Sequence, residues 1–154
     1  MSQVDRKYLF IFMYLSLLVL VAVPPILSTY RFLVTPDRWL VVNEVYVFDT
    51  VVGKSPRMRV SRDIKTDFRA DWIAEVHRRG SSGFHVVCTA RGGNDYRVDN
   101  ALPDNLDLDW WTYPTQCDLP PGDYQVETLW IIHPEGYPEK LVRSLTNVFT
   151  VRPG

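Results

Sequence analysis

The hydrophobic pattern of the chain changes once, near Arg31. No charged residue lies between Lys7 and Arg31, and 18 of the 23 residues from Tyr8 to Tyr30 are apolar or aromatic. A helix of this length reaches about 34 Å, enough to cross a hydrocarbon layer of about 30 Å. We therefore expect a cytoplasmic leader at 1–7 and a transmembrane helix at 8–30, with Tyr8 and Tyr30 at its two interfaces.

Two other interpretations of this apolar stretch are a buried core helix and a cleaved signal peptide. A core helix would carry a polar stripe, and residues 9–15 show none. A signal peptide would end in small residues spaced as in A-x-A, which residues 21–25 lack. We therefore favour a retained anchor, in which Pro24 and Pro25 kink or end the helix near the far interface.

The basic residues around the span favour one orientation. Arg6, Lys7 and the terminal amine precede the span, whereas Arg31 and Arg38 follow it, so the positive-inside rule leans toward a cytoplasmic N-terminus. We expect a juxtamembrane linker at 31–40 and a folded domain at 41–154 outside the cytoplasm, in the periplasm if the host is a bacterium.

Beyond Arg31 the apolar residues alternate, which predicts β-strands. Residues 41–48 are apolar on both faces and predict a central strand, and alternation from Ile64 to Val76 is long enough to predict a bend or a change of sheet near Ala70. Further signals follow in order: a turn at 80–83, a strand at 84–90, a turn at 92–94, an irregular connection at 95–115 with a short strand at 108–111, a strand at 124–132, a turn at 134–138 and a returning strand at 141–151. The domain is therefore predicted to be all-β.

One short motif resembles a known architecture. The residues Leu119-Pro120-Pro121-Gly122-Asp123-Tyr124, followed by the alternating strand, resemble the tyrosine corner of immunoglobulin-like domains. The resemblance implies an antiparallel immunoglobulin-like β-sandwich in which the Tyr124 hydroxyl bonds to an upstream backbone group, with Leu119 and Gly122 in the same corner.

The two cysteines do not follow the antibody pattern, because Cys117 lies seven residues before Tyr124 rather than two after it. Two Cys in an exported domain are more often paired than free, so we expect a disulfide between Cys88 and Cys117. Its closed loop of about thirty residues would contribute about 3 kcal/mol in the loop-entropy model.

Composition argues against several functions. The 154 residues carry 17 Lys+Arg and 18 Asp+Glu, a formal net charge of -1, which gives no attraction to nucleic acid. The spacing of His77, His85 and His133 matches no metal motif, and no nucleophile motif such as G-x-S-x-G is present. We therefore expect no catalysis, no cofactor and no metal.

Two groups of residues are candidates for surface contacts. A basic series could meet anionic lipid or an acidic partner, although Asp63 and Asp67 could equally balance it on a solvent-facing strand. An aromatic cluster is a candidate partner contact, because adjacent side chains on a strand point to opposite faces and one Trp must be exposed or covered. The basic series comprises Arg57, Arg59, Arg62 and Lys65, and the aromatic cluster comprises Trp110, Trp111 and Tyr113.

These features together predict a membrane-anchored, non-catalytic binding module or an accessory subunit of a membrane complex, with lipid and a protein as its partners. The layout is similar to that of small single-span membrane proteins of bacteria and prophages. That resemblance implies an alternative role in lysis, exclusion or virion assembly. A periplasmic enzyme with a site assembled from scattered residues is the second alternative, and the oligomeric state stays open.

Overall fold

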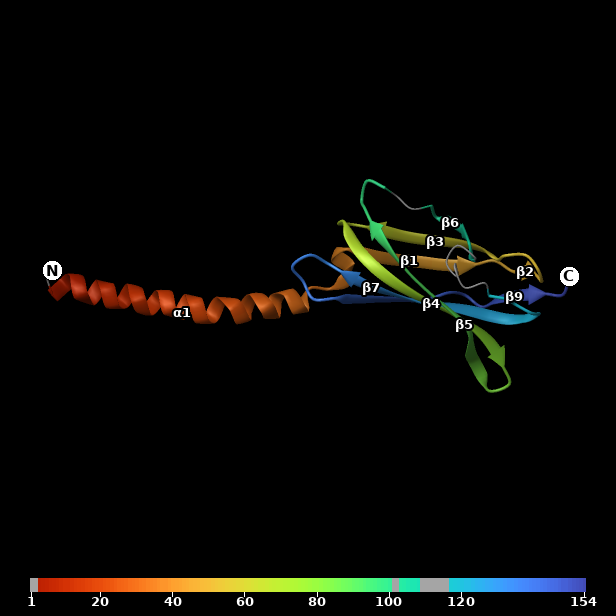
Figure 1. The fold of residues 1–154 in the computed structure, drawn as a ribbon, viewed down its shortest axis with the longest axis horizontal. Coiled ribbons are helices and arrows are strands. Elements are labelled where there is room, and N and C mark those ends of the chain that lie inside the picture. The colour runs from red at the N-terminus through yellow and green to blue at the C-terminus, as the bar shows by residue number, and fades with distance from the viewer. Residues whose placement is uncertain (1–2, 101–102, 109–116) are drawn as a thin grey trace. The chain divides into compact units, whose positions relative to one another are not determined.

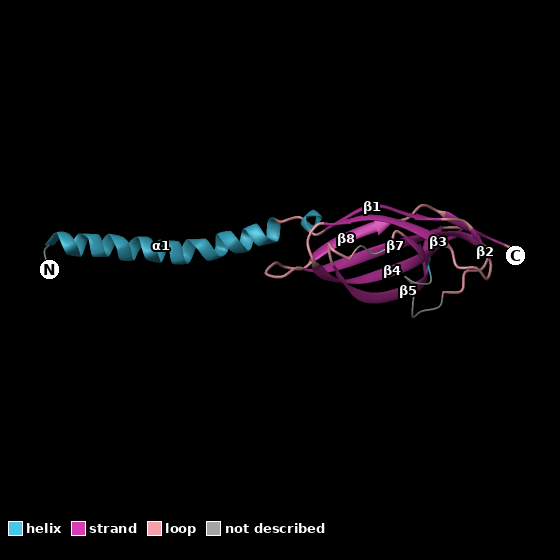
Figure 2. Cartoon of the chain, turned by 90° about the horizontal axis from the view of Figure 1, so that it is seen from above, coloured by secondary structure: helices cyan, strands magenta, loops and turns pink. Residues whose placement is uncertain are grey.

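The computed structural model describes residues 3–100, 103–108 and 117–154 (Figures 1 and 2). The chain forms one long helix, one 3₁₀ turn and a series of strands. In order these are α1 (Gln3–Leu33), η1 (Pro36–Arg38), β1 (Leu40–Val47), β2 (Thr50–Val51), β3 (Arg57–Ile64), β4 (Phe68–Gly80), β5 (Gly83–Tyr96), β6 (Asn105–Asp107), β7 (Gly122–His133), β8 (Lys140–Leu145) and β9 (Phe149–Arg152).

The chain divides into two compact units. One consists of residues 1–34 with 136–138, and the other consists of residues 35–135 with 139–154, which we call the two-sheet domain. The segment 31–40, predicted as a linker, contains the end of α1, the turn η1 and the first residue of β1. Leu40 is only 1% exposed, so the core of the two-sheet domain already begins within this segment.

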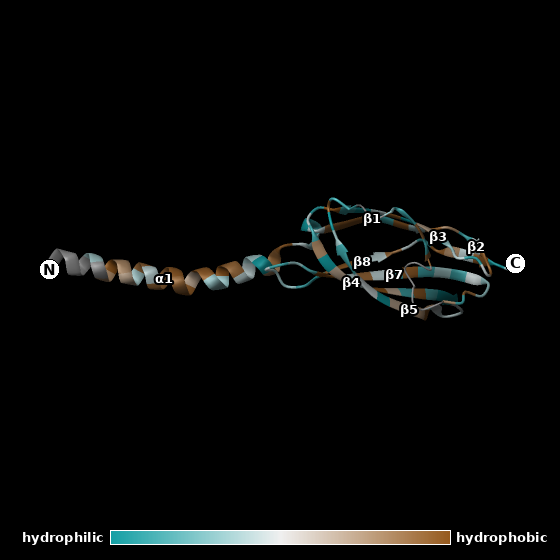
Figure 3. Ribbon diagram, turned by 45° about the horizontal axis from the view of Figure 1, so that its top comes forward, coloured by the Kyte–Doolittle hydropathy of each residue, from teal (hydrophilic) through white to brown (hydrophobic). Residues whose placement is uncertain are grey.

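The helix α1 is apolar along most of its length, as the hydropathy colouring in Figure 3 shows. Its segment Phe10–Leu33 has 24 residues, a mean hydropathy of 2.5 and no buried share, so it is long and apolar enough to cross a membrane and is not a core helix. Of the two outcomes predicted for Pro24 and Pro25, a kink or an end of the helix, the end is wrong, because α1 continues through both. The Thr29 hydroxyl donates a hydrogen bond of 2.8 Å to the Pro25 carbonyl one turn earlier, as threonine side chains in helices commonly do.

The strands form two sheets. One has the order β1-β3-β6, and the other has the order β2-β9-β7-β4-β5, with β8 also paired to β7. All pairs are antiparallel except β2 with β9. The strand β1 lies at the edge of its sheet, so the prediction of a central strand is wrong. Its outward apolar positions are aromatic and exposed: Tyr46 and Phe48 form an edge-to-face pair with centroids 5.0 Å apart.

The long alternating segment does change sheets, but not near Ala70. Strand β3 belongs to the smaller sheet and β4 to the larger one, so the chain crosses between them at residues 65–67. Ala70 lies inside the continuous strand β4 and is fully buried. The face predicted from alternation is nevertheless the buried one, with Phe68, Ala70, Trp72, Ala74 and Val76 in the core.

The predicted turn at residues 92–94 is wrong, because β5 continues through it to Tyr96. Both glycines belong to the strand: Gly92 pairs with Trp72 and Gly93 with Asp71. A Cβ on Gly92 would lie 2.7 Å from Cε2 of Trp72 and closer still to Cζ2, so no larger residue fits without movement of the indole. Glycine here provides room for a large neighbour on the next strand rather than a change of direction.

The last part of the chain matches the predicted hairpin, with one interruption. Strand β7 pairs with β8 and then with β9, and the two partners are separated at residues 146–148. At that break the buried Thr146 hydroxyl accepts a hydrogen bond of 2.9 Å from the Val126 N–H, which replaces a missing strand contact. The short strand predicted at 108–111 is found earlier as β6, and residues 109–111 lie outside the described residues.

The two sheets lie in two layers (Figure 3), and buried apolar side chains come from both of them. Asn147 ties the layers together, because its side chain accepts from the Val47 N–H at 2.8 Å and donates to the Val47 carbonyl at 2.9 Å. The largest fully buried side chains come from both sheets: Leu40, Val47, Met58, Val60, Val76, Leu108, Tyr124, Val126, Trp130, Ile132, Phe149 and Val151.

Candidate binding surfaces on the two-sheet domain

The tip of the β4–β5 hairpin extends from the body of the two-sheet domain, as Figure 1 shows. The strands turn between Gly80 and Gly83, as the sequence predicts. A register shift near the tip pairs Val76 with Cys88 and His77 with Val86, which leaves Val87 as an extra residue. Such a bulge twists the strand and changes the direction of neighbouring side chains.

Three apolar side chains of β5 at and beyond this bulge are exposed to solvent. Phe84 is 37% exposed, Val86 46% and Val87 43%. We call these three residues the hairpin tip. The Arg79 guanidinium lies over the Phe84 ring, 5.6 Å from its centroid, and 3.6 Å from the Asp123 carboxylate, so a basic group borders the apolar side chains. An apolar cluster with a charged border is typical of a protein contact surface.

A disulfide fixes β5 next to the hairpin tip. Cys88 and Cys117 are joined, with their Cα atoms 5.9 Å apart, as the sequence predicts. Cys88 is half-buried on β5. The aromatic candidates Trp110, Trp111 and Tyr113 lie outside the described residues.

Tyr124 lies on β7 opposite Arg78 of β4, and it makes the hydrogen bond to an upstream backbone group that its motif predicts. Its hydroxyl donates to the Pro120 carbonyl at 2.6 Å, its ring is fully buried, and burial raises the pKa of the phenol. Arg78 of β4 packs over this ring at 5.9 Å and donates to the Pro121 carbonyl at 2.8 Å. The motif residues Leu119 and Gly122 flank this corner and are half-buried.

Of the basic residues predicted as one anionic-surface contact, Arg57 and Arg59 lie two positions apart on the exposed face of β3, whereas Arg62 and Lys65 lie elsewhere. Arg57 and Arg59 are exposed on β3, and Arg59 forms an ion pair of 3.0 Å with Glu44. Arg62 is half-buried and donates to the Pro103 carbonyl at 3.4 Å, and burial lowers its pKa. Lys65 lies in the crossing between the sheets. Side chains alternate along β3, so Arg62 lies on the opposite face of the strand from Arg57 and Arg59.

A pocket of about 650 Å³ lies beside the exposed end of β3. Its wall includes one predicted residue, Arg57, and no pattern in the sequence singles out the others. Their proximity depends on the pairing of β3 with β6, which places Arg57 opposite Asp107 and Met58 opposite Leu106. The described residues that line it are Phe48, Arg57, Met58, Asn105, Leu106 and Asp107.

Two of the three histidines, His133 and His77, lie beside carboxylate side chains. His133 lies between two carboxylates, with Nε2 2.9 Å from Asp71 and Nδ1 3.2 Å from Glu139. His77 lies 3.6 Å from the Glu75 carboxylate. In the part of the chain that the structure describes, no group of three or more His, Cys, Asp or Glu side chains is placed to hold a metal ion.

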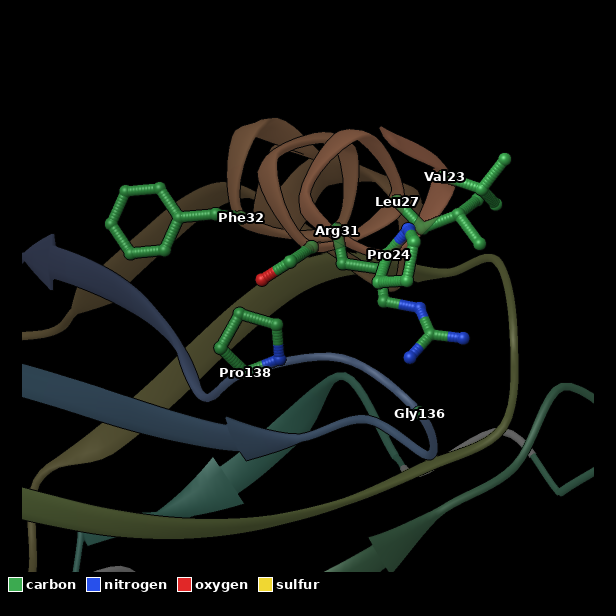
Figure 4. A pocket seen from close by; sticks show the side chains of 8 residues that line it. Val23, Pro24, Leu27, Arg31, Phe32, Gly136 and Pro138 are labelled. Carbon is green, nitrogen blue, oxygen red and sulfur yellow. The ribbon is translucent and has the colours of Figure 1, made fainter. Parts of the chain in front are cut away.

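The unit that contains α1 has a pocket of its own, of about 550 Å³ (Figure 4). Among the described residues its lining is mostly apolar, with Arg31 as the one charged member. These lining residues are Val23, Pro24, Leu27, Ser28, Arg31, Phe32, Gly136 and Pro138.

The geometry thus presents two candidate surfaces, the hairpin tip and the pocket beside β3 and β6. Part of the first surface can be found in the sequence, because the apolar residues Phe84, Val86 and Val87 follow a glycine-bounded turn. Comparison of the chain with protein-family models, with curated proteins and with solved structures finds no match.

Proposed function

We propose that this chain is a single-pass, membrane-anchored binding module that holds a protein partner through its hairpin tip. In this proposal α1 is a retained anchor, residues 1–7 are cytoplasmic, and the two-sheet domain is extracytoplasmic. The domain is an immunoglobulin-like sandwich that supports a membrane-associated assembly and performs no catalysis.

The observation that carries the proposal is the exposure of Phe84, Val86 and Val87 side by side on one strand. The surface of a soluble domain tolerates scattered apolar side chains. Three apolar side chains within four residues of a projecting hairpin form a cluster that a partner can cover. At about 25 cal/mol per Å², covering roughly 200 Å² of such surface contributes about 5 kcal/mol before the cost of association is subtracted.

Other features support the remaining parts of the proposal. The paired Cys88 and Cys117 suit an oxidising compartment such as the periplasm. The bond from Tyr124 to the Pro120 carbonyl suits the corner of an immunoglobulin-like sandwich. The segment Phe10–Leu33 has the length and hydropathy of a membrane span.

The partner contact can be tested by photocrosslinking in native membranes. A crosslinking amino acid at position 87 of the full chain should capture a discrete protein, and Val86→Asp should abolish that adduct by placing a charge in the contact. Leu141→Asp is the matched control, because Leu141 is 60% exposed on β8 and away from the hairpin. The proposal fails if no adduct forms, or if both substitutions reduce it equally.

The orientation is tested separately. An accessibility tag after Gly154 should be labelled from outside the cytoplasm in intact cells, and the chain should stay in the membrane after alkaline washing. Labelling only after the cells are opened would overturn the proposed orientation.

A further inference from the structure

The pocket beside β3 and β6 combines opposite charges with an aromatic wall. Phe48 follows β1 and is held beside β3, since its N–H donates to the Arg57 carbonyl at 2.9 Å. The Phe48 ring is 44% exposed, whereas Met58 at 1% and Leu106 at 9% form a buried apolar floor. Arg57, Asn105 and Asp107 are exposed at the rim.

The polar side chains of this rim do not satisfy one another. Arg57 and Asp107 are directly opposite in the strand pairing, yet among the described residues neither forms an ion pair within 4.0 Å. Neighbouring surface arginines behave differently, because Arg59 pairs with Glu44 at 3.0 Å and Arg152 with Asp49 at 3.1 Å. The pocket therefore offers an arginine fork, a carboxylate and an amide that remain available to a ligand.

We propose that this pocket binds one ring of a neutral saccharide. A sugar hydroxyl is both donor and acceptor, so it can accept from Arg57 and donate to Asp107, while the Asn105 amide can do either. The apolar face of the ring packs against Phe48. The opposite charges of Arg57 and Asp107 cancel, so an anionic ligand meets the carboxylate and a cationic ligand meets the guanidinium. The volume of about 650 Å³ lies within the usual range for small-ligand sites.

The proposal concerns a surface other than the hairpin tip and does not depend on the proposed protein partner. It is tested by saturation-transfer NMR and titration with the full chain in a zwitterionic detergent, because sugar-based detergents would compete. The probes are uncharged tetrasaccharides of glucose and of N-acetylglucosamine. A sialylated oligosaccharide and an uncharged tetrapeptide serve as comparison ligands.

At least one neutral tetrasaccharide should bind, with an affinity that changes less than twofold between 50 and 500 mM salt because no net charge is involved. Phe48→Ala and Asp107→Asn should each weaken binding at least tenfold. Arg59→Ala should change it less than twofold, since Arg59 lies outside the pocket lining. Unchanged thermal unfolding of the variants shows that their fold is intact.

The proposal is overturned if no neutral tetrasaccharide binds, if the pocket variants bind as well as the original chain, or if the sialylated sugar or the peptide binds more tightly. Capture of a protein at position 87 together with absent sugar binding would refute this inference alone. Sugar binding without a captured protein would refute the hairpin contact alone.

Discussion

The substitution Gly92→Ala tests whether β5 runs straight past Trp72. A single methyl group at this position would lie 2.7 Å from Cε2 and 3.1 Å from Cη2 of the Trp72 indole, which is 9% exposed and packed in the core. Contacts this short force the indole or the strand to move. Overpacking of a core typically costs about 1–3 kcal/mol, so we expect a loss of about 2 kcal/mol in the free energy of unfolding.

The adjacent substitution Gly93→Ala is the matched control. Its methyl group meets Oδ1 of Asp71 at 2.6 Å, which is the end of a half-exposed side chain that can rotate away. Both substitutions gain the same entropy from replacing glycine in a strand, so the difference between them reports the clash with Trp72. Rotation of Asp71 gives up its 2.9 Å contact with His133, and a partly exposed pair of this kind contributes about 0–1 kcal/mol, so we expect Gly93→Ala to cost no more than about 1 kcal/mol.

Thermal unfolding of the full chain in detergent, followed by tryptophan fluorescence and circular dichroism, measures both effects. A loss of about 2 kcal/mol in a domain of about 120 residues lowers the Tm by roughly 8 °C. In the background of Trp72→Phe, which removes the crowded ring, Gly92→Ala should cost less than about 0.5 kcal/mol. Equal costs for the two glycine substitutions, or a cost unchanged by Trp72→Phe, would refute the continuous strand.

Three further predictions concern other parts of the two-sheet domain. Tyr124→Phe removes the 2.6 Å bond to Pro120 and should destabilise the domain by about 1 kcal/mol; unchanged thermal unfolding would contradict that bond. Replacing Cys88 and Cys117 together by serine should cost about 3 kcal/mol, and an identical Tm with and without reductant in the original chain would contradict the pairing. Burial raises the pKa of Tyr96, so its stabilisation is present below about pH 10 and is lost as the pH rises through the folded-state pKa. Tyr96→Phe should therefore flatten the decline of the Tm as the pH rises above about 10, and an equally steep decline would refute this.

Local periodicity was sufficient to place the helix, most strands and the buried face of β4. The alternation at Phe68, Ala70 and Trp72 follows from the two-residue repeat of any strand, so no tertiary information is needed. The back-bond of Tyr124 and the pairing of Cys88 with Cys117 also followed from the sequence. The first is a contact over four residues, and the second was the only pairing that two cysteines allow within the chain.

Contacts with residues distant in sequence determined the features that the sequence did not predict. Gly92 and Gly93 have turn-like composition, yet the bulk of Trp72 on the adjacent strand explains why a glycine is needed there. The edge position of β1 depends on which strands pair, and alternation within one strand contains no information about its partners.

Each candidate surface also combines a feature of the local sequence with a feature that depends on strand pairing. The apolar residues Phe84, Val86 and Val87 can be found in the sequence, but the bulge beside them arises from the pairing of β5 with β4. Arg57 and Asp107 are separated by fifty positions and become neighbours only through the register of β3 with β6. Sequence by itself determined the apolar helix and the strand-forming segments, because these depend on interactions within a few residues. Tertiary structure determined the edges, bulges and pocket, because these depend on which strands meet and in what register.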